Sequence, residues 1–176
     1  MRRIYLYTYY GFARFLPASY TPIVGNIARW IRYQLCKRIF KRCGRNVNIE
    51  RMAFFENGSE IEIGDNSGLG VNCVIPQNTI IGENVMMGPN CYIFRSNHAF
   101  NRIDIPMRLQ GYSELKQTII EDDVWIGRNV TITPGRIIKK GTIVGACCLL
   151  SKDFPEYSVI GGNPGEIIYN RKENNK

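Results

Sequence analysis

Aliphatic side chains return at every sixth position along two long stretches of this chain. They occupy Ile63, Leu69, Ile75, Ile81, Met87 and Ile93 in the first stretch, and Ile120, Ile126, Ile132, Ile138, Val144 and Leu150 in the second. A period of six fits neither an α-helix nor a single half-buried strand. It is typical of a chain that makes a short strand, turns a corner and repeats, so that each coil buries its aliphatic side chains against the next. The pattern predicts a parallel β-helix.

Residues that suit tight corners follow these aliphatic positions. Glycine comes directly after six of them, at Gly64, Gly70, Gly82, Gly88, Gly127 and Gly145. Asparagine comes three positions after five of them, at Asn66, Asn72, Asn78, Asn84 and Asn90. Both residue types accept the left-handed backbone conformation that a tight corner needs. We therefore expect the corners of the β-helix at these positions.

The six-residue phase breaks once, between the two stretches. Ile93 and Ile120 are 27 positions apart, which is not a multiple of six. Residues 99–117 are therefore predicted to leave the β-helix as an excursion loop. Loops longer than about 12–15 residues are uncommon in compact domains and are often functional. The only histidine of the chain, His98, stands where this excursion begins.

Residues 1–44 differ from the repeats because they are rich in aromatic and basic side chains. Pro17 and Pro22 divide them into two predicted helices, at residues 3–15 and 26–42. The predicted domains are a helical arm at 1–44, a β-helix domain at 45–168 with an irregular first coil at 45–62, and a polar C-terminal tail at 169–176. The fold class is thus all-β, with a helical arm and an excursion loop attached.

The excess of positive charge in the chain lies in its N-terminal part. The formal net charge is +8, yet residues 1–49 hold ten Lys and Arg and no Asp or Glu. Such an arm predicts an anionic partner, and we expect peripheral contact with a membrane, at the inner face of the cytoplasmic membrane. The arm could equally cap the open end of the β-helix, and both roles are compatible. Nothing resembles a nucleic-acid-binding motif.

The apolar part of the arm does not predict a membrane-spanning helix or a signal peptide. The longest uncharged run, residues 15–28, is interrupted by prolines and glycine and contains fewer than the roughly 20 residues that a span requires. No small-residue cleavage motif follows the first apolar run. We therefore expect a cytoplasmic protein.

The cysteines and the single histidine argue against a metal site. None of the six cysteines forms a C-x-x-C pair. Cys73 and Cys91 are 18 positions apart, so we expect them to stack in adjacent coils as small buried side chains. A β-helix enzyme of the carbonic anhydrase type would need three histidine ligands for zinc. His98 is better suited to act as a general base, because an unperturbed imidazole titrates close to neutral pH.

Several motifs follow one another in a specific order along residues 61–168. They are Gly88-Pro89-Asn90, Asn97-His98, Asp123-Val124-Trp125-Ile126-Gly127, Pro134-Gly135, Val144-Gly145-Ala146, Ser151-Lys152-Asp153-Phe154-Pro155 and Gly162-Asn163-Pro164. With these motifs the chain resembles the hexapeptide-repeat acyltransferases, which fold as left-handed parallel β-helices. Within that family it is most similar to the galactoside, maltose and xenobiotic O-acetyltransferases. The Ile105-Pro106-Met107 and Gln110-Gly111 segments of the excursion are similar to O-acetyltransferases from surface-polysaccharide clusters.

The resemblance implies a homotrimer that binds acetyl-CoA in a groove between neighbouring subunits. It implies that His98 takes the proton from an acceptor hydroxyl, that a backbone amide near Gly127 stabilises the oxyanion, and that Trp125 lines the channel of the pantetheine arm. The positions implied to contact coenzyme A are Trp125, Arg128, Gly145, Ala146, Ser151, Lys152 and Arg171. The positions implied to contact the acceptor are Asn72, Asn90, Met107 and Gln110. No metal is required.

Two positions depart from the family pattern. Gly70 stands where galactoside-type members carry an acceptor-binding asparagine, and this leaves the identity of the acceptor open. Glu166 stands where a basic residue often faces the phosphates of coenzyme A, and Arg171 or Lys172 could replace that charge.

The sequence thus predicts an acetyl-CoA-dependent O-acetyltransferase that acts on a sugar or glycan in surface polysaccharide biosynthesis. An N-acetyltransferase of nucleotide-linked amino sugars, or an amino acid acetyltransferase, remains an alternative because an amine acceptor would also need His98. An inactive β-helix that serves as an assembly scaffold is the non-enzyme alternative, and the presence of His98, Trp125 and Lys152 argues against it.

Overall fold

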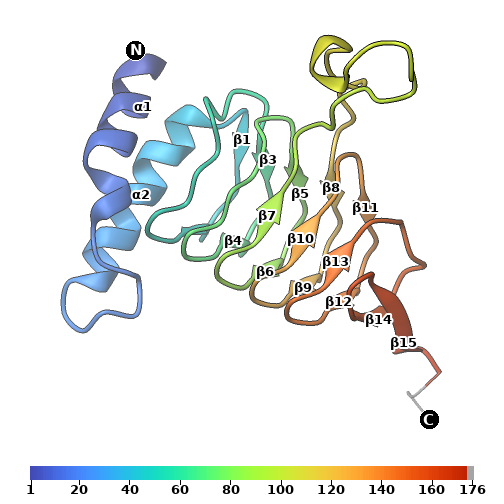
Figure 1. The fold of residues 1–176 in the computed structure, drawn as a ribbon. Helices are drawn as coiled ribbons and strands as arrows, with labels where there is room; N and C mark the ends of the chain where they lie inside the picture. Colours follow the sequence, from blue (N-terminus) through green and yellow to red (C-terminus); the bar gives the residue numbers. More distant parts are fainter. Residues whose placement is uncertain (174–176) are drawn as a thin grey trace.

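The computed structural model describes residues 1–173 and shows two helices followed by a solenoid of short strands (Figure 1). The arm contains α1 (Arg2–Gly11), the 3-10 helix η1 (Ala13–Phe15) and α2 (Gly25–Ile39). Both predicted helices are present but end earlier than expected. Helix α1 ends at a glycine, the weakest helix former after proline. Helix α2 ends at Ile39 because Phe40 is extended, with ψ 155°, and leads the chain into the first strand.

The solenoid has three faces, and the chain visits them in the same order in each coil. Face 1 contains β1 (Arg42–Cys43), β3 (Glu62–Ile63), β5 (Ile80–Ile81), β8 (Ile119–Ile120) and β11 (Ile137–Ile138). Face 2 contains β2 (Asn48–Ile49), β4 (Gly68–Leu69), β6 (Met86–Met87), β9 (Trp125–Ile126), β12 (Ile143–Val144), β14 (Ser158–Gly161) and β15 (Glu166–Asn170). Face 3 contains β7 (Tyr92–Ile93), β10 (Thr131–Ile132) and β13 (Leu149–Leu150), extended by bridges from Phe54 and Val74. The predicted left-handed β-helix of hexapeptide repeats is confirmed.

The register of the strands measures the length of each coil. Ile119 pairs in parallel with Ile137, 18 positions later, which is three hexads. The first coil is longer, because Arg42 pairs with Glu62. Ile80 pairs with Ile119, 39 positions later, so the excursion adds 21 residues to its coil. The short 3-10 helix η2 (Met107–Leu109) lies within this excursion, which projects from the solenoid (Figure 1).

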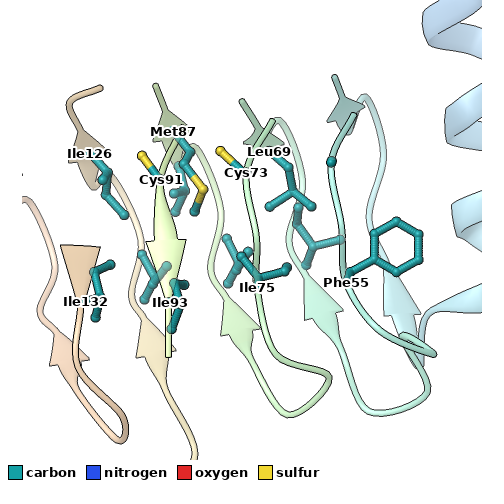
Figure 2. Packing of buried hydrophobic residues seen from close by; sticks show 14 of the residues in the cluster. Phe55, Leu69, Cys73, Ile75, Met87, Cys91, Ile93, Ile126 and Ile132 are labelled. Atoms are coloured by element: carbon teal, nitrogen blue, oxygen red, sulfur yellow. The ribbon is translucent and has the colours of Figure 1, made fainter. Parts of the chain in front are cut away.

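The hexad residues fill the interior of the solenoid (Figure 2). In the two-residue strands after β1 the second side chain points inward and is buried, as in Ile63 and Ile126, both 0% exposed. Cys73 and Cys91 are buried at the edge of this core, as predicted, and each thiol donates to the Gly88 carbonyl at 3.2 Å. The first side chain of each strand points outward, and therefore decides what each face offers to a ligand or to a neighbouring subunit.

Asparagines form the corners at four of the five positions that the sequence indicated. Asn66, Asn72, Asn84 and Asn90 have φ between 57° and 59°, in the left-handed region. Asn78 does not adopt this conformation, and its side chain donates to the Lys116 carbonyl at 3.2 Å.

The corner asparagines are also linked by side-chain hydrogen bonds from coil to coil. Asn72 donates to Asn90 at 3.0 Å, and Asn90 donates to Asn129 at 3.1 Å. This ladder fixes the spacing of the coils at the corner between faces 2 and 3.

The arm caps the N-terminal end of the solenoid (Figure 1). The ring of Tyr9 is fully buried and packs on Phe55 with a centroid distance of 4.5 Å, and Phe40 packs on Phe55 edge to face at 4.8 Å. The hydroxyl of Tyr9 donates to the Ala53 carbonyl at 2.9 Å. Burial raises the pKa of Tyr10, which donates to the Glu56 carbonyl, to about 12. The inner side of the arm therefore completes the hydrophobic core.

A buried ion pair locks the arm onto the first coil. The Arg32 guanidinium is 0% exposed and lies 3.6 Å from the Glu50 carboxylate. Arg32 also donates to the carbonyls of Leu16 and Pro17, while the amide and hydroxyl of Ser19 donate to Glu50. These contacts hold the loop between α1 and α2 against the solenoid.

The C-terminal end is closed by the antiparallel pair β14 and β15. Strand β15 continues to Asn170, so ordered structure extends two residues into the segment that was expected to be a polar tail. The rest of that predicted tail is a turn at 171–173, and residues 174–176 lie outside the described part of the chain.

Candidate functional site

His98 lies in the neck of the excursion, where the chain leaves face 3. The two sides of this neck are joined by hydrogen bonds from the Ala99 amide to the Gly111 carbonyl at 3.1 Å and from the Ser113 amide to the Asn97 carbonyl at 2.8 Å. The His98 backbone forms an isolated antiparallel bridge with Tyr112. The neck therefore holds the imidazole on two strands rather than on a free loop, while leaving it exposed to solvent.

The imidazole ring is oriented by an aromatic neighbour. His98 and Tyr112 stack with a centroid distance of 4.7 Å and an angle of 26° between the rings. A cavity of about 420 Å³ lies beside this pair, lined by Arg95, Ser96, Tyr112 and Leu115. The neck therefore presents a titratable ring next to a space that a substrate can enter.

Trp125 occupies an outward position on face 2, at the start of β9. Its neighbours in register are Met86 of β6 and Ile143 of β12. The indole is 50% exposed and Met86 is 61% exposed. These side chains make an apolar stripe along the outside of face 2, which could hold the unbranched chain of a thioester substrate.

The corner between faces 2 and 3 contains four positions that the resemblance indicated, Gly127 and Arg128 in one coil and Gly145 and Ala146 in the next. The Gly127 amide donates to the Val144 carbonyl at 2.8 Å. It is therefore used in the strand ladder and cannot also bind an oxyanion. The next amide, that of Arg128, has no acceptor among residues 1–173. A Cβ on Gly127 would come within 2.7 Å of the Ala146 nitrogen, so the coils approach each other closely here.

A groove of about 690 Å³ lies over face 2 between the arm and Arg128. The polar residues that line it include Asn48, Glu50, Ser67 and Asn90, and Tyr20 and Arg29 line it from the arm. Hydrogen bonds from Ser19 and Asn48 and the charge of Arg32 hold the pKa of Glu50 below its usual value, although burial, the largest single influence, acts to raise it. The groove therefore has a charged, hydrogen-bonding floor.

Ser151 and Lys152 lie at a different corner, the one between faces 3 and 1, directly after β13. The Lys152 ammonium is 3.7 Å from the Glu166 carboxylate and 5.5 Å from the centre of the Phe154 ring. The position that departs from the family pattern, Glu166, thus pairs with the lysine that was expected to meet a phosphate.

Arg171 lies at the third corner, between faces 1 and 2. Its guanidinium donates to the Gly141 carbonyl at 2.6 Å and lies 3.6 Å from the Asp123 carboxylate. Lys172 pairs with Glu156. Neither Arg171 nor Lys172 lies near Lys152. Both residues that were expected to replace the basic charge missing at Glu166 therefore already have partners of their own.

The four positions expected to contact the acceptor have different surroundings. Asn90 lines the groove, whereas Asn72 is a member of the corner ladder and is not part of the groove lining. Gln110 donates to the carbonyls of Arg102 and Ile105, and so braces the excursion. Met107 is 63% exposed on η2. Among these four side chains, the one hydrogen bond within residues 1–173 is that from Asn72 to Asn90.

Gly70 has no space for the asparagine that the galactoside branch carries. A Cβ on Gly70 would lie 2.2 Å from the Gly88 carbonyl oxygen and 2.6 Å from that of Met87. The departure at this position is therefore built into the packing of adjacent coils.

Most of the predicted residues fall into two sets that flank face 3, whereas Arg171 lies apart at the third corner. The first set, on face 2 and the corner that follows it, contains Trp125, Gly127, Arg128, Gly145 and Ala146. The second set, at the corner between faces 3 and 1, contains His98, Met107, Gln110, Ser151 and Lys152. In Figure 1 the excursion projects at the top, whereas β6, β9 and β12 lie at the bottom of the solenoid. One chain therefore does not bring the two sets together.

Some residues of this region carried no signal in the sequence. Tyr112 stacks on His98 but is 14 positions away in an aperiodic segment. Tyr20 and Arg29 reach the groove only because the arm folds back on the first coil. Of these neighbours, only Met86 could have been predicted from the sequence. It lies 39 positions before Trp125, which is the length of the coil that contains the excursion.

Residues 1–173 contain neither a metal-binding cluster nor a membrane-spanning helix. No group of three or more His, Cys, Asp or Glu side chains in this part of the chain is arranged to hold a metal ion. No helix within the same residues combines the length and apolar character that crossing a membrane requires.

The repeats match a known family model. Residues 60–95 and 117–152 match the model described as "Bacterial transferase hexapeptide (six repeats)". The Saccharomyces cerevisiae protein YJL218W, which carries the name of an acetyltransferase, is 36% identical over 137 residues, or 77% of this chain and 68% of its own length.

Two solved structures are similar over most of the chain. A maltose O-acetyltransferase from Clostridium difficile 630 is 31% identical, with a TM-score of 0.70 over 80% of this chain and 75% of the other. A galactoside acetyltransferase solved in complex with coenzyme A is 26% identical, with a TM-score of 0.76 over 96% of this chain and 78% of the other. Both are enzymes that acetylate a sugar.

Proposed function

Because this chain belongs to the hexapeptide-repeat acetyltransferases, we propose that it transfers the acetyl group of acetyl-CoA to a sugar hydroxyl in the biosynthesis of a surface polysaccharide or another glycan. The observation that carries the proposal is the division of the site. One corner of face 3 offers the only imidazole of the chain, and the other offers an apolar stripe and an amide without an acceptor among the described residues.

A homotrimer would join the two sets. In a ring of three subunits, each subunit turns one face toward the axis and presents the two edges of that face to its two neighbours. With face 3 toward the axis, the His98 corner of one subunit lies against the Arg128 corner of the next. Face 3 suits this position because its outward side carries the exposed aromatic rings of Phe54, Tyr92 and Phe94. Burial of these rings would stabilise the ring of subunits.

His98 acts as the general base in this proposal. Its imidazole takes the proton of the acceptor hydroxyl while the oxygen attacks the thioester carbonyl carbon. The carbon–sulfur bond then breaks, and the thiolate of coenzyme A leaves and regains a proton from the imidazolium. The Arg128 amide donates to the oxyanion, a role for which the Gly127 amide is already occupied.

The residues on face 2 fit the thioester substrate. Trp125, Met86 and Ile143 provide an apolar wall for its pantetheine arm, and Gly145 and Ala146 leave the adjacent corner free of large side chains. Lys152 lies at the His98 corner, which comes from the neighbouring subunit in the proposed trimer. It supplies a positive charge for a phosphate group, and its contact with Glu166 weakens that charge. Ser151 precedes this lysine on the same corner.

The groove over face 2 is the acceptor site in this proposal. The groove presents the hydroxyl of Tyr20, the guanidinium of Arg29 and the amide of Asn90, which can exchange hydrogen bonds with sugar hydroxyls. Residues 1–44 are proposed to make peripheral contact with a membrane on the cytoplasmic side, because the arm contains basic residues and no acidic ones.

The test is release of free thiol from acetyl-CoA across a panel of sugars, glycans and amino sugars, with the masses of the products. O-acetylation of a sugar would support the proposal. Transfer to an amine alone would favour the N-acetyltransferase alternative, and no release with any acceptor would favour a scaffold.

A further inference from the structure

The outer side of the arm exposes a continuous set of large apolar side chains. We call the residues of the interhelical loop and the first two turns of α2 the apolar edge. The members of the apolar edge are Tyr20, Ile23, Val24, Ile27 and Trp30, which are between 43% and 93% exposed. An exposed apolar patch of this kind marks an interaction site in a soluble protein.

The most exposed of these residues is held in an unfavourable conformation. Ile23 is 93% exposed and has φ 68°, in the left-handed region that β-branched residues rarely adopt. The Val24 amide donates to the Pro22 carbonyl at 2.8 Å and closes a tight turn around Ile23. Outliers of this kind cluster at functional sites, where the surrounding structure maintains them. The turn fixes Ile23 at the tip of the loop, where it contributes nothing to the core.

The arm that carries the apolar edge has a strong positive charge. Residues 1–49 contain ten Lys and Arg and no acidic residue. Arg29, next to Trp30, lies at the edge itself and is half-buried, whereas the exposed Arg2, Arg3, Lys37 and Arg38 lie at the opposite end of the helix pair, where α1 begins and α2 ends (Figure 1). An arm with an apolar end and an excess of basic side chains matches a bilayer with anionic headgroups. A second copy of the same arm is a poor partner, because both surfaces carry the same charge.

The apolar edge is continuous with the acceptor groove. Tyr20 belongs to the edge and also lines the groove over face 2. Arg29 lines the same groove, and together with Trp30 it lines a smaller hollow of about 250 Å³ on the side of the arm. A bilayer that touches Trp30 and Tyr20 would therefore lie at the mouth of the groove.

We propose that the apolar edge docks the protein on an anionic bilayer and that the acceptor is a glycan carried on a membrane lipid. This inference rests on the proposed acetyltransferase function and names the class of its acceptor. Docking would keep the groove within reach of sugars attached to lipid headgroups, so membrane binding and acceptor choice depend on the same residues. A soluble sugar would gain nothing from the docking.

Docking is tested without any measurement of activity. Full-length protein is mixed with vesicles of phosphatidylcholine alone or with phosphatidylglycerol. We expect binding only to the anionic vesicles, weakened at least about tenfold by the double variant Ile23→Ser, Trp30→Ser. The matched control is Ile168→Ser, which removes a similarly exposed side chain at the far end of the solenoid. Equal binding by the double variant and the control, or equal binding to both kinds of vesicle, would overturn the proposal.

A tryptophan signal gives a second measure of docking. In the variant Trp125→Phe the only remaining tryptophan is Trp30. Its emission is expected to shift to the blue when anionic vesicles are added, because the indole enters the interface. The absence of a blue shift would contradict docking. A smaller particle after replacement of Ile23 and Trp30, measured without vesicles, would show instead that another copy of the chain covers the edge.

The class of acceptor is tested with one sugar presented in two ways. The sugar that gives the fastest thiol release in the panel is attached to dioleoylglycerol in phosphatidylglycerol vesicles, or supplied as its soluble methyl glycoside. We expect kcat/KM to be at least about tenfold higher for the lipid-linked form, and the double variant to lose this advantage while acting normally on the soluble form. Equal kcat/KM values would reject the lipid-linked acceptor but leave the acetyltransferase function intact, whereas no release with either form would reject that function.

Discussion

The imidazole of His98 stacks on the ring of Tyr112, with 4.7 Å between the ring centres and 26° between the ring planes. The two residues are also joined as a backbone bridge in the neck of the excursion. Tyr112 is therefore a positioning residue. Its ring limits the orientations of the imidazole by stacking and not by a side-chain hydrogen bond.

Replacement of His98 by Asn should lower the turnover with a sugar acceptor by at least about 100-fold, because a hydroxyl needs a base at neutral pH. Binding of coenzyme A, measured by calorimetry, should change little. Tyr112→Phe keeps the stacking ring and should be nearly as active as wild type, whereas Tyr112→Ala should lower kcat more than it raises KM. A His98→Asn variant with more than about a tenth of wild-type turnover would show that another group takes the proton.

Mixed trimers should recover activity that neither parent shows. His98→Asn disables one corner of face 3, and Ala146→Trp blocks the other. In every trimer that contains both variants, one of the three interfaces should combine an intact His98 with an intact Ala146 from the next subunit, so about a third of wild-type activity is expected. Activity near that fraction of wild type, in trimers separated by two affinity tags, would support a shared site. Trimers as inactive as both parents would place the whole site in one chain.

Glu166 should weaken the interaction of Lys152 with acetyl-CoA, because the two side chains lie 3.7 Å apart. Replacement of Lys152 by Gln should raise the KM for acetyl-CoA roughly threefold to tenfold with little change in kcat, while Glu166→Gln should lower it. Lys140→Gln, an exposed lysine at another corner, is the matched control. An unchanged KM in both variants would remove Lys152 from the cofactor contacts.

The buried pair of Arg32 and Glu50 should make a large contribution to stability. Glu50→Gln leaves the 0% exposed guanidinium without its counter-ion, which should lower the free energy of unfolding by about 3 kcal/mol. For a chain of this size the melting temperature should fall by roughly 6–12 °C. Arg45→Gln breaks an ion pair whose arginine is 90% exposed and should leave the melting temperature unchanged. Equal effects of the two variants would contradict the role of the buried pair.

The contribution of Glu50 should also depend on pH. Its pKa is lower in the folded protein than its usual value, so its charged form stabilises the fold above the pKa of the unfolded state, and this contribution disappears as the pH falls through the folded pKa. The difference in melting temperature between wild type and Glu50→Gln should therefore be complete above about pH 5 and shrink at more acidic pH. A difference that stays constant down to pH 3 would show that the Glu50 charge is not involved.

The sequence by itself determined the solenoid and its corners. Each hexad contains its own strand and turn, so the phase of Ile120, Ile126 and Ile132 predicts the buried positions without knowledge of distant contacts. The same local logic placed Asn66 and Asn84 at left-handed corners. It also located the excursion, because an insertion changes the phase of everything that follows it, and it singled out His98 at its start.

Only the tertiary structure decided which faces carry the chemistry and what the arm does. The period of six does not tell which of three faces a hexad occupies, because that depends on the length of the excursion. The register of Met86 with Trp125 and the separation of His98 from Arg128 therefore required coordinates. The burial of Arg32 against Glu50 and the approach of Tyr20 and Arg29 to the groove depend on packing between segments far apart in sequence, which no local pattern encodes.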